Sequence, residues 1–179
     1  MSLPLRAPGR ALSNTGMTQT LSLRRAVEAD IGALDRLFQR SYMQLLAPDY
    51  SPAVLVTAVP VIGRAQPALI RSGTFHVVES GGRMLGAGGW SMQAPGGKPG
   101  QRGIGHVRHV ATDPDHTGRG VGRLLMQYIA MEAKASGMVM LHCQSTLTAV
   151  PFYEAMGFVA QGPITVPLTG GIDFPAQLM

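Results

Sequence analysis

Three alternating glycines between an expected strand and an expected helix constrain this chain more than any other feature. An apolar strand pattern covers residues 104–112, and helical spacing of apolar residues covers 118–136. Glycine lets backbone approach a ligand without a Cβ, and the first amides of a helix lack internal partners at its positive end. The turn is therefore predicted to bind an anion, with Arg119 and Arg123 adding charge. The three glycines are Gly118, Gly120 and Gly122.

The residues that the turn lacks limit the classes of phosphate-containing ligand that it can bind. A P-loop requires Lys-Ser or Lys-Thr after its glycines, and neither follows here. A dinucleotide fingerprint needs a third glycine at the position of Arg123 and an acidic residue about twenty residues later. The next expected strand, 138–143, contains no acidic residue. Both of these nucleotide-binding classes are therefore excluded.

The remaining pattern predicts one α/β domain of the α+β type, with a mixed, mostly antiparallel sheet and helices on both faces. A strand, a glycine-rich turn, a helix and a further strand in that order predict two parallel neighbours, whereas the hairpins should be antiparallel. We expect a disordered extension over 1–18 and the domain over 19–179. Four prolines in 47–71 indicate short helical pieces that form a lid or wall rather than core. The expected strands are 21–25, 74–79, 84–91, 104–112, a buried 138–143, 158–166 and 172–179, and the expected helices are 29–46, 118–136 and 148–156.

The charge and cysteine content indicate the partners and the compartment. The formal net charge of +5 favours anionic partners such as phosphates. Basic residues are scattered and aromatic residues make up only 6%, so nucleic acid is not the expected partner. No apolar stretch is long enough to span a membrane. A single cysteine, Cys143, excludes a disulfide within the chain, and we expect a cytoplasmic protein with this thiol buried and inert.

Two motifs at a fixed separation identify a family resemblance. The first is Thr112-Asp113-Pro114 followed by Thr117-Gly-Arg-Gly-Val-Gly122, and the second is Thr146, Ala149, Phe152-Tyr-Glu154 and Gly157-Phe158. Together they resemble the GNAT superfamily of acyl-CoA-dependent N-acetyltransferases, over roughly residues 21–179. Thr117 stands where the family usually has Gln or Arg, and Thr146 stands where it has Asn.

The resemblance implies a domain whose sheet splays between the strand ending at Thr112 and its parallel neighbour, with acetyl-CoA in the gap. The implied activity is direct transfer of the acetyl group to a primary amine of a small molecule or protein. A catalytically silent acyl-CoA-binding module is the alternative, and a homodimer stays open. The residues implied to bind acetyl-CoA are Val110, Ala111, Thr112, Thr117, Gly118, Arg119, Gly120, Val121, Gly122, Arg123, Thr146 and Tyr153.

Catalysis by the family chemistry requires an acid for the leaving thiolate and a base for the amine. Tyr153 matches the family tyrosine near the thioester sulfur, which implies a general acid. His106 lies where some members carry a base; Glu79 and ordered water are the alternatives. Strand alternation predicts His106, Arg108 and Val110 on one face and His109 on the other. No metal is expected, because neither H-x-x-x-H nor C-x-x-C spacing occurs.

Overall fold

The computed structural model describes residues 20–179, so the extension predicted over 1–18 lies outside the described residues. The order of elements along the chain is the order expected from the sequence, apart from the additional short strand at Gln144–Ser145. The helices are α1 (Ile31–Leu45), α2 (Pro52–Ile62), α3 (Pro67–Arg71), α4 (Val121–Ala135) and α5 (Val150–Ala155). The strands are β1 (Ser22–Arg25), β2 (Phe75–Ser80), β3 (Arg83–Ser91), β4 (Ile104–Thr112), β5 (Met140–His142), β6 (Gln144–Ser145), β7 (Gly162–Leu168) and β8 (Ile172–Leu178).

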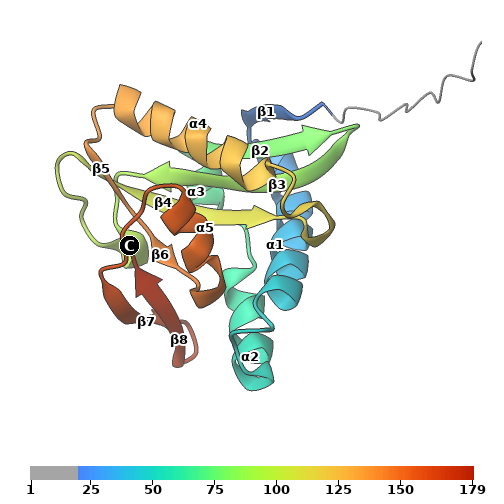
Figure 1. Ribbon diagram of the computed structural model, residues 1–179, viewed down its shortest axis with the longest axis vertical. Coiled ribbons are helices and arrows are strands. Elements are labelled where there is room, and N and C mark those ends of the chain that lie inside the picture. The colour runs from blue at the N-terminus through green and yellow to red at the C-terminus, as the bar shows by residue number, and fades with distance from the viewer. Residues whose placement is uncertain (1–19) are drawn as a thin grey trace, which may run out of the picture.

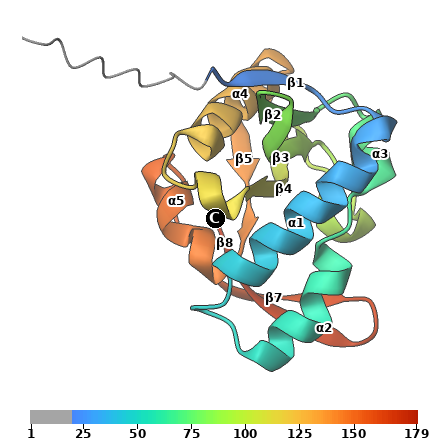
Figure 2. The same ribbon diagram turned by 90° about the vertical axis from the view of Figure 1, so that its right-hand side faces the viewer.

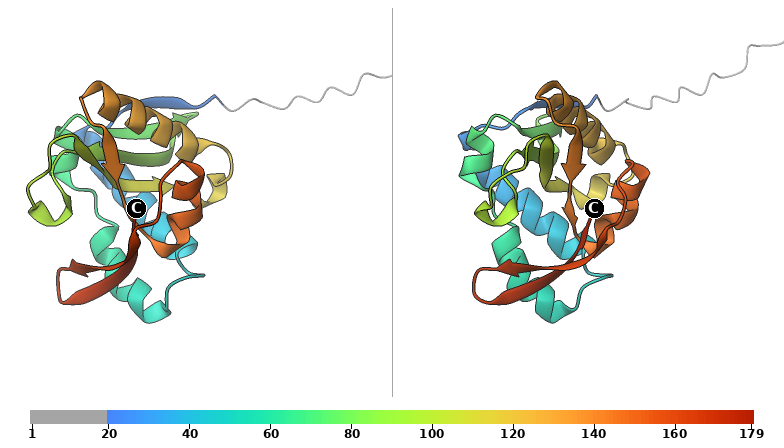
Figure 3. Two further views of the ribbon diagram at one scale, coloured as in Figure 1. Left: turned by 60° about the vertical axis from the view of Figure 1, so that its left-hand side comes forward. Right: turned by 90° about the vertical axis from the view of Figure 1, so that its left-hand side faces the viewer.

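The strands form a five-stranded sheet in the order β1-β2-β3-β4-β5 and a three-stranded sheet in the order β6-β8-β7. All neighbours are antiparallel except β4 and β5, which confirms the predicted mixed sheet with one parallel pair. Cys143 and Met179 exchange two backbone hydrogen bonds of 2.8 and 2.9 Å, and these bonds join the two sheets. The closing hairpin β7–β8 thus belongs to a second sheet that projects from the first (Figure 3).

Helices cover both faces of the five-stranded sheet, as predicted (Figure 1). Successive residues of a strand point to opposite faces, so Val78 packs with Leu125 of α4 and Tyr153 of α5, whereas Val77 packs with Phe38 of α1. Figure 2 shows α1 crossing its face of the sheet obliquely. The two faces are called the α4 face and the α1 face below.

A β-bulge in β4 breaks the predicted alternation and corrects the assignment of side chains to faces. His109 has a φ of 49°, which is unusual for a residue with a side chain, and the register with β3 shifts between Ala87 and Gly89. Val107 therefore packs in the α4-face core, while Ala111 packs in the α1-face core. Val110 lies on the α4 face with Val107 and not with His106 and Arg108, contrary to the prediction.

The proline-rich segment 47–71 contributes to a core of its own, so the expectation of a lid without core was wrong. Leu55, Ala58 and Val59 of α2 are buried against Phe174 of β8 (Figure 3). Tyr50 strengthens this contact because its hydroxyl donates to the Pro175 carbonyl at 2.8 Å. Pro60 lies in the last turn of α2, and the helix continues to Ile62.

The strand expected to be buried over 138–143 is shorter and more exposed than predicted. β5 contains only Met140, Leu141 and His142, and the side chains of Val139 and Met140 are 88% and 53% exposed. β5 lies at the edge of its sheet and pairs with β4 alone within that sheet, which explains the exposure. No helix in residues 20–179 is long and apolar enough to cross a bilayer.

Candidate active site

A cavity of about 530 Å³ opens where β4 separates from β5. The pairing of these strands stops at His106 and His142, and beyond this pair the two strands are no longer hydrogen-bonded to each other. The walls come from the end of β4, the turn after it, the start of α4, α5 and the end of α1. The lining residues are Ser41, Tyr42, Leu45, Leu46, Val110, Ala111, Thr112, His116, Thr117, Gly118, Gly120, Val121, Gly122, Arg123, Thr146, Thr148, Ala149, Phe152, Tyr153, Ala155 and Met156.

The structure thus brings eleven of the twelve predicted cofactor residues to one cavity. Only Arg119 does not line it. Arg119 is exposed in the turn, so its side chain extends into solvent rather than packing against the cavity wall. Thr117 and Thr146, the two departures from the family pattern, both line the wall. Their shorter hydroxyl side chains replace Gln or Arg and Asn there, and the Thr117 hydroxyl donates to the Pro114 carbonyl at 3.3 Å.

The three glycines of the turn serve two different purposes. Gly118 and Gly120 have φ values of +71° and +84°, in the region that disfavours residues with side chains. Gly122 has ordinary helical backbone, but an added Cβ would lie 3.2 Å from the ring of Phe152. Two glycines therefore shape the turn, and the third allows α4 and α5 to approach closely beside the cavity.

Backbone amides at the start of α4 form an anion-binding surface. Among the described residues, the amides from Gly118 to Arg123 donate to no backbone or side-chain oxygen; the first helical bond of this region runs from Leu124 to the Gly120 carbonyl at 2.9 Å. Unpaired amides at the positive end of a fifteen-residue helix favour a negatively charged ligand. This observation fits the phosphates of coenzyme A to the residues present.

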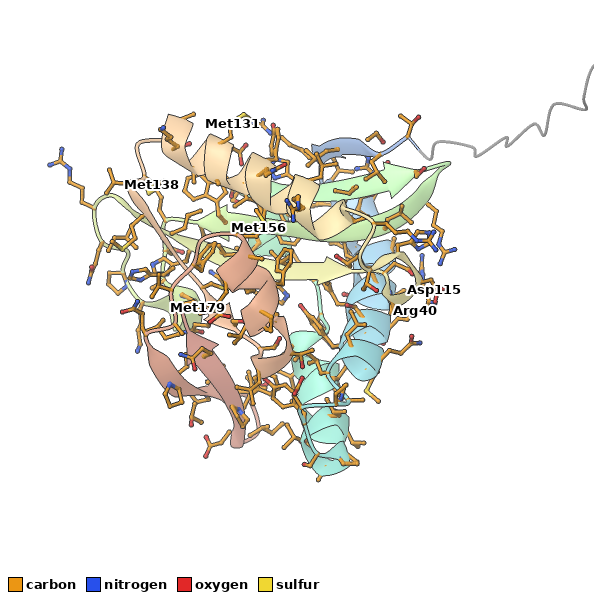
Figure 4. The ribbon with its side chains drawn as sticks, viewed as in Figure 1. Arg40, Asp115, Met131, Met138, Met156 and Met179 are labelled. Carbon is orange, nitrogen blue, oxygen red and sulfur yellow. The ribbon has the colours of Figure 1, made fainter. Side chains whose placement is uncertain are left out.

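A buried carboxylate, Asp113, holds the turn in place. Asp113 is 4% exposed and accepts hydrogen bonds from Arg40 at 2.7 Å, from Arg83 at 3.0 Å and from the Asp115 amide at 2.9 Å, and His116 lies 3.2 Å away. Burial raises the pKa of Asp113, but the hydrogen bonds from His116, the Asp115 amide and Arg83 outweigh it, so the pKa lies below its usual value. Figure 4 shows Arg40 of α1 reaching Asp115 in the same turn.

The free edge of β4 forms the wall between the turn and the point where the strands separate. β3 pairs with one edge of β4 as far as Thr112, whereas β5 pairs with the other edge only over Ile104, Gly105 and His106. Among the described residues no strand covers that second edge from Val107 to Thr112. An unpaired strand edge can hydrogen-bond an extended, amide-containing ligand as an added strand would.

Tyr153 lines the cavity and is only 5% exposed. Its ring packs between Phe152 and Phe158, with centroids 5.2 and 5.3 Å away, which fixes its orientation. Burial, together with the neighbouring Cys143 thiol, raises the pKa of Tyr153 well above its usual value. The phenol is therefore protonated at neutral pH and can act as a hydrogen donor.

Cys143 is buried, as the sequence predicted. Burial raises the pKa of the Cys143 thiol to about 12, against a smaller opposing effect of the hydrogen bond with Tyr153. Because the thiolate is the reactive form of cysteine, this thiol is a poor nucleophile near neutral pH.

The two candidate bases lie outside the cavity wall. His106 is half-buried on the α1 face, with its ring 5.8 Å from that of His142. Burial, followed by the charges of His142 and Arg108, lowers the pKa of His106, so its imidazole is neutral at pH 7. Glu79 binds Arg24 through both carboxylate oxygens and lies on β2, which the cavity does not reach.

Sequence reasoning missed the contribution of α1 to the site. Ser41, Tyr42 and Leu45 line the cavity, although nothing in their spacing distinguishes them from ordinary residues of an amphipathic helix. It also missed the role of Asp113, which was quoted only as part of a motif. A proline directly after an aspartate marks a turn, but the arginines that bind this aspartate come from α1 and β3. No group of three or more metal-binding side chains occurs in residues 20–179.

Comparison with protein families places this geometry among known enzymes. A family model described as "Acetyltransferase (GNAT) domain" matches residues 71–160, which is half of the chain and includes β4, the glycine turn, α4 and α5. The matched stretch therefore contains the cavity wall except for Ser41, Tyr42, Leu45 and Leu46.

Individual proteins agree with the family match. A glucosamine 6-phosphate N-acetyltransferase from Trypanosoma brucei brucei is 27% identical over 139 residues, which cover 75% of this chain and 91% of that protein. The structure of a GCN5-related N-acetyltransferase from Rhodopseudomonas palustris superposes with a TM-score of 0.71 at 23% identity, covering 91% of this chain and 96% of that one. A GNAT acetyltransferase from Brucella melitensis in complex with acetyl-CoA gives a TM-score of 0.59 at 17% identity, over 90% and 88% of the two chains.

Proposed function

Because the chain belongs to the GNAT family of acetyltransferases and is an acetyl-CoA-dependent N-acetyltransferase, we propose that it acetylates a primary amine of a small molecule or a protein. One observation carries this proposal. The same cavity is lined by unpaired helix amides, by an open strand edge and by the buried side chain of Tyr153. The name of the trypanosome relative supports a small amine as one acceptor class.

The binding of acetyl-CoA follows the three parts of the wall. The amides of Gly118 to Arg123 bind the pyrophosphate, with the Arg123 guanidinium beside them, and the backbone from Val110 to Thr112 hydrogen-bonds the pantetheine arm. Thr117 and Thr146 add hydroxyl contacts. Arg119, which does not line the cavity, contributes positive charge from the outer side of the turn. When bound, acetyl-CoA supplies an acyl group activated as a thioester.

The chemical step needs one proton removed and one supplied. A nitrogen–carbon bond forms and the carbon–sulfur bond breaks, so the amine loses a proton and the departing sulfur gains one. Tyr153 supplies the proton to sulfur, because its phenol is protonated and held by two aromatic rings. His106, which is neutral at pH 7, accepts the proton from the amine directly or through water. The proton taken up by His106 passes to solvent, and Tyr153 recovers its own from solvent.

The role of Tyr153 is tested by Tyr153→Phe with an acetyl-CoA consumption assay over amino acids, amino sugars, polyamines and peptides. We expect kcat to fall about 100-fold, since positioned general acids contribute about 10²–10⁴-fold, while the Kd of CoA changes little because the ring packing is retained. Tyr128→Phe is the matched control, because Tyr128 lies on α4 against His76 and outside the cavity.

Two outcomes would contradict the proposal in different ways. Unchanged kcat in Tyr153→Phe would remove the general acid. Binding of acetyl-CoA without release of CoA to any amine in the panel would favour the silent binding module instead.

A further inference from the structure

Arg108 is a half-buried arginine whose partners are neutral. Its guanidinium donates to Ser91 Oγ at 3.0 Å and to Gln66 Oε1 at 3.4 Å. Among the described residues, no carboxylate lies within 4.0 Å of it. Burial lowers the pKa of Arg108, which reflects the cost of removing the cation from water without a counter-charge.

Arg24 shows how this chain treats another partly buried arginine. Arg24 binds Asp30 at 2.8 Å and Glu79 at 2.6 Å, so two carboxylates neutralise it. Carboxylates match the planar guanidinium because they accept two parallel hydrogen bonds. The neutral partners of Arg108 leave such an anion position open, and Gln66 is itself exposed, so solvent reaches this position.

Gln66 links Arg108 to His109 through its side-chain amide. Arg108 donates to Oε1 of Gln66, so the amide nitrogen of Gln66 faces His109 Nε2, 3.1 Å away. An amide nitrogen can only donate, and His109 Nε2 must therefore accept, which places the proton of the neutral imidazole on Nδ1. Burial, with Arg108 nearby, lowers the pKa of His109 to about 4, so the ring is neutral at pH 7. His109 Nδ1 is buried and has no partner among the described residues.

Because of the bulge, Arg108 and His109 lie on the same face of β4, and the acceptor substrate can approach from that face. Val110 lies on the α4 face. On that face the amides at the start of α4 and the ring of Phe152 line the cavity. Arg108 and His109 are consecutive residues that contact Gln66 on the other side of β4. Two substrates that react at one atom must meet from different directions. If acetyl-CoA occupies the cavity, the acceptor amine approaches from the other side and passes Arg108, which lies two residues before the wall residue Val110 on β4.

We propose that Arg108 binds a carboxylate or phosphate on the acceptor, so that the acceptor is a primary amine with an acidic group. The acidic group occupies the open position beside Ser91 and Gln66 and orients the amine toward the gap between β4 and β5. This inference rests on the proposed acetyl transfer and specifies its acceptor. The same preference disfavours polycationic acceptors, since the Arg108 guanidinium would repel them.

The test compares acceptors that differ only in the acidic group. Glucosamine 6-phosphate is assayed against glucosamine, and glycine against glycinamide, with the wild-type protein and Arg108→Gln. The quantity measured is the ratio of kcat/KM for the acidic acceptor to that for the neutral one. We expect this ratio to fall by about 10- to 100-fold in Arg108→Gln for one pair, the range for hydrogen bonds to a charged group. The pair affected tells phosphate from carboxylate.

Two further variants separate recognition from folding. Arg102→Gln removes the same charge from an exposed position near the start of β4, and its ratio should equal that of the wild type. Arg108→Lys keeps the charge without the two-pronged geometry, and its ratio should lie between those of wild type and Arg108→Gln. A variant that only disturbed the fold would lower both kcat/KM values and leave their ratio unchanged. An unchanged ratio in both pairs overturns the proposal.

A binding measurement keeps this result separate from failure of the proposed function. Inorganic phosphate and acetate are titrated into protein saturated with CoA, which occupies the helix amides, and chemical shifts or melting temperature report binding. Tighter binding by at least about tenfold in wild type than in Arg108→Gln supports the site even if no amine in the panel is acetylated. Equal binding of both anions by the two proteins overturns it, whether or not acetyl transfer occurs.

Discussion

The glycine turn and the surface around Arg108 are two anion-binding regions built on opposite principles. The turn presents backbone amides, so Thr117 and Thr146 can replace longer residues without removing the main contacts. The surface around Arg108 consists of Gln66, which precedes α3, and of side chains from β3 and β4, where β4 has a bulge. A backbone site thus tolerates replacement of its side chains, whereas a side-chain site changes its ligand preference when one of them is replaced.

The backbone site is most sensitive to a change of local conformation. Gly120→Val forces a β-branched residue into a φ of +84°, which costs about 1–3 kcal/mol. We expect the Kd of CoA, measured by calorimetry, to rise about tenfold or more, while the acidic-to-neutral acceptor ratio stays that of wild type. Gly97→Val is the matched control, because Gly97 has a φ of +72° in the 92–103 loop. If both variants weakened CoA equally, general destabilisation would explain the effect.

The side-chain region should contribute the pH dependence. The pKa of His106 is lowered by burial and by the charges of His142 and Arg108, so the base is fully neutral above its usual value near 6.5. We expect kcat to be flat from pH 7 to 8 and to fall only below pH 6.5, where His106 becomes protonated. His106→Gln should lower kcat by about tenfold and abolish this acidic limb.

The control for the acidic limb is His142→Gln. Removing His142 removes one of the charges that lower the pKa of His106, so the limb should persist and move to higher pH. A pH profile of kcat that is identical in wild type and His106→Gln would identify water as the base.

The smallest expected effect concerns the support of the turn. Asp113→Asn removes the charge that Arg40 and Arg83 bind, and we expect a loss of about 1–2 kcal/mol in the free energy of unfolding, with a few-fold weaker CoA. Asp115→Asn is the control, because Asp115 contacts the same arginines but is 61% exposed, and exposed pairs contribute about 0–1 kcal/mol.

The pH dependence of this contribution has a defined sign. The pKa of Asp113 is lower in the folded protein than in the unfolded chain, so its stabilisation is complete above the unfolded pKa near 4. It is lost as the pH falls through the lower folded pKa. Melting temperatures of wild type and Asp113→Asn should therefore differ at pH 7 and converge below pH 4. A constant difference across this range would show that the charge of Asp113 is not what stabilises the turn.

Sequence patterns predicted the order of elements because most of this order depends on local spacing. The strand 104–112 was predicted with its observed bounds, and the expected helix 118–136 became α4, three residues shorter at its start. The helix starts later because Gly118 and Gly120 have left-handed backbone, which ends the turn before Val121. The exposure of β5 and the burial of α2 were predicted wrongly. β5 is exposed because it lies at the edge of its sheet, and α2 is buried because it packs against β8 from the other end of the chain.

The sequence by itself determined the family, the glycine turn and the position of Tyr153, because each is encoded in a short run of neighbouring residues. Only the tertiary structure decided that His109 lies on the α1 face beside Arg108 and that Val110 lies on the α4 face. Alternation gave the wrong answer there, because a single residue with a φ of 49° reverses the parity of the strand. That conformation is imposed by pairing with β3 and by packing against α1, so it follows from contacts distant in sequence.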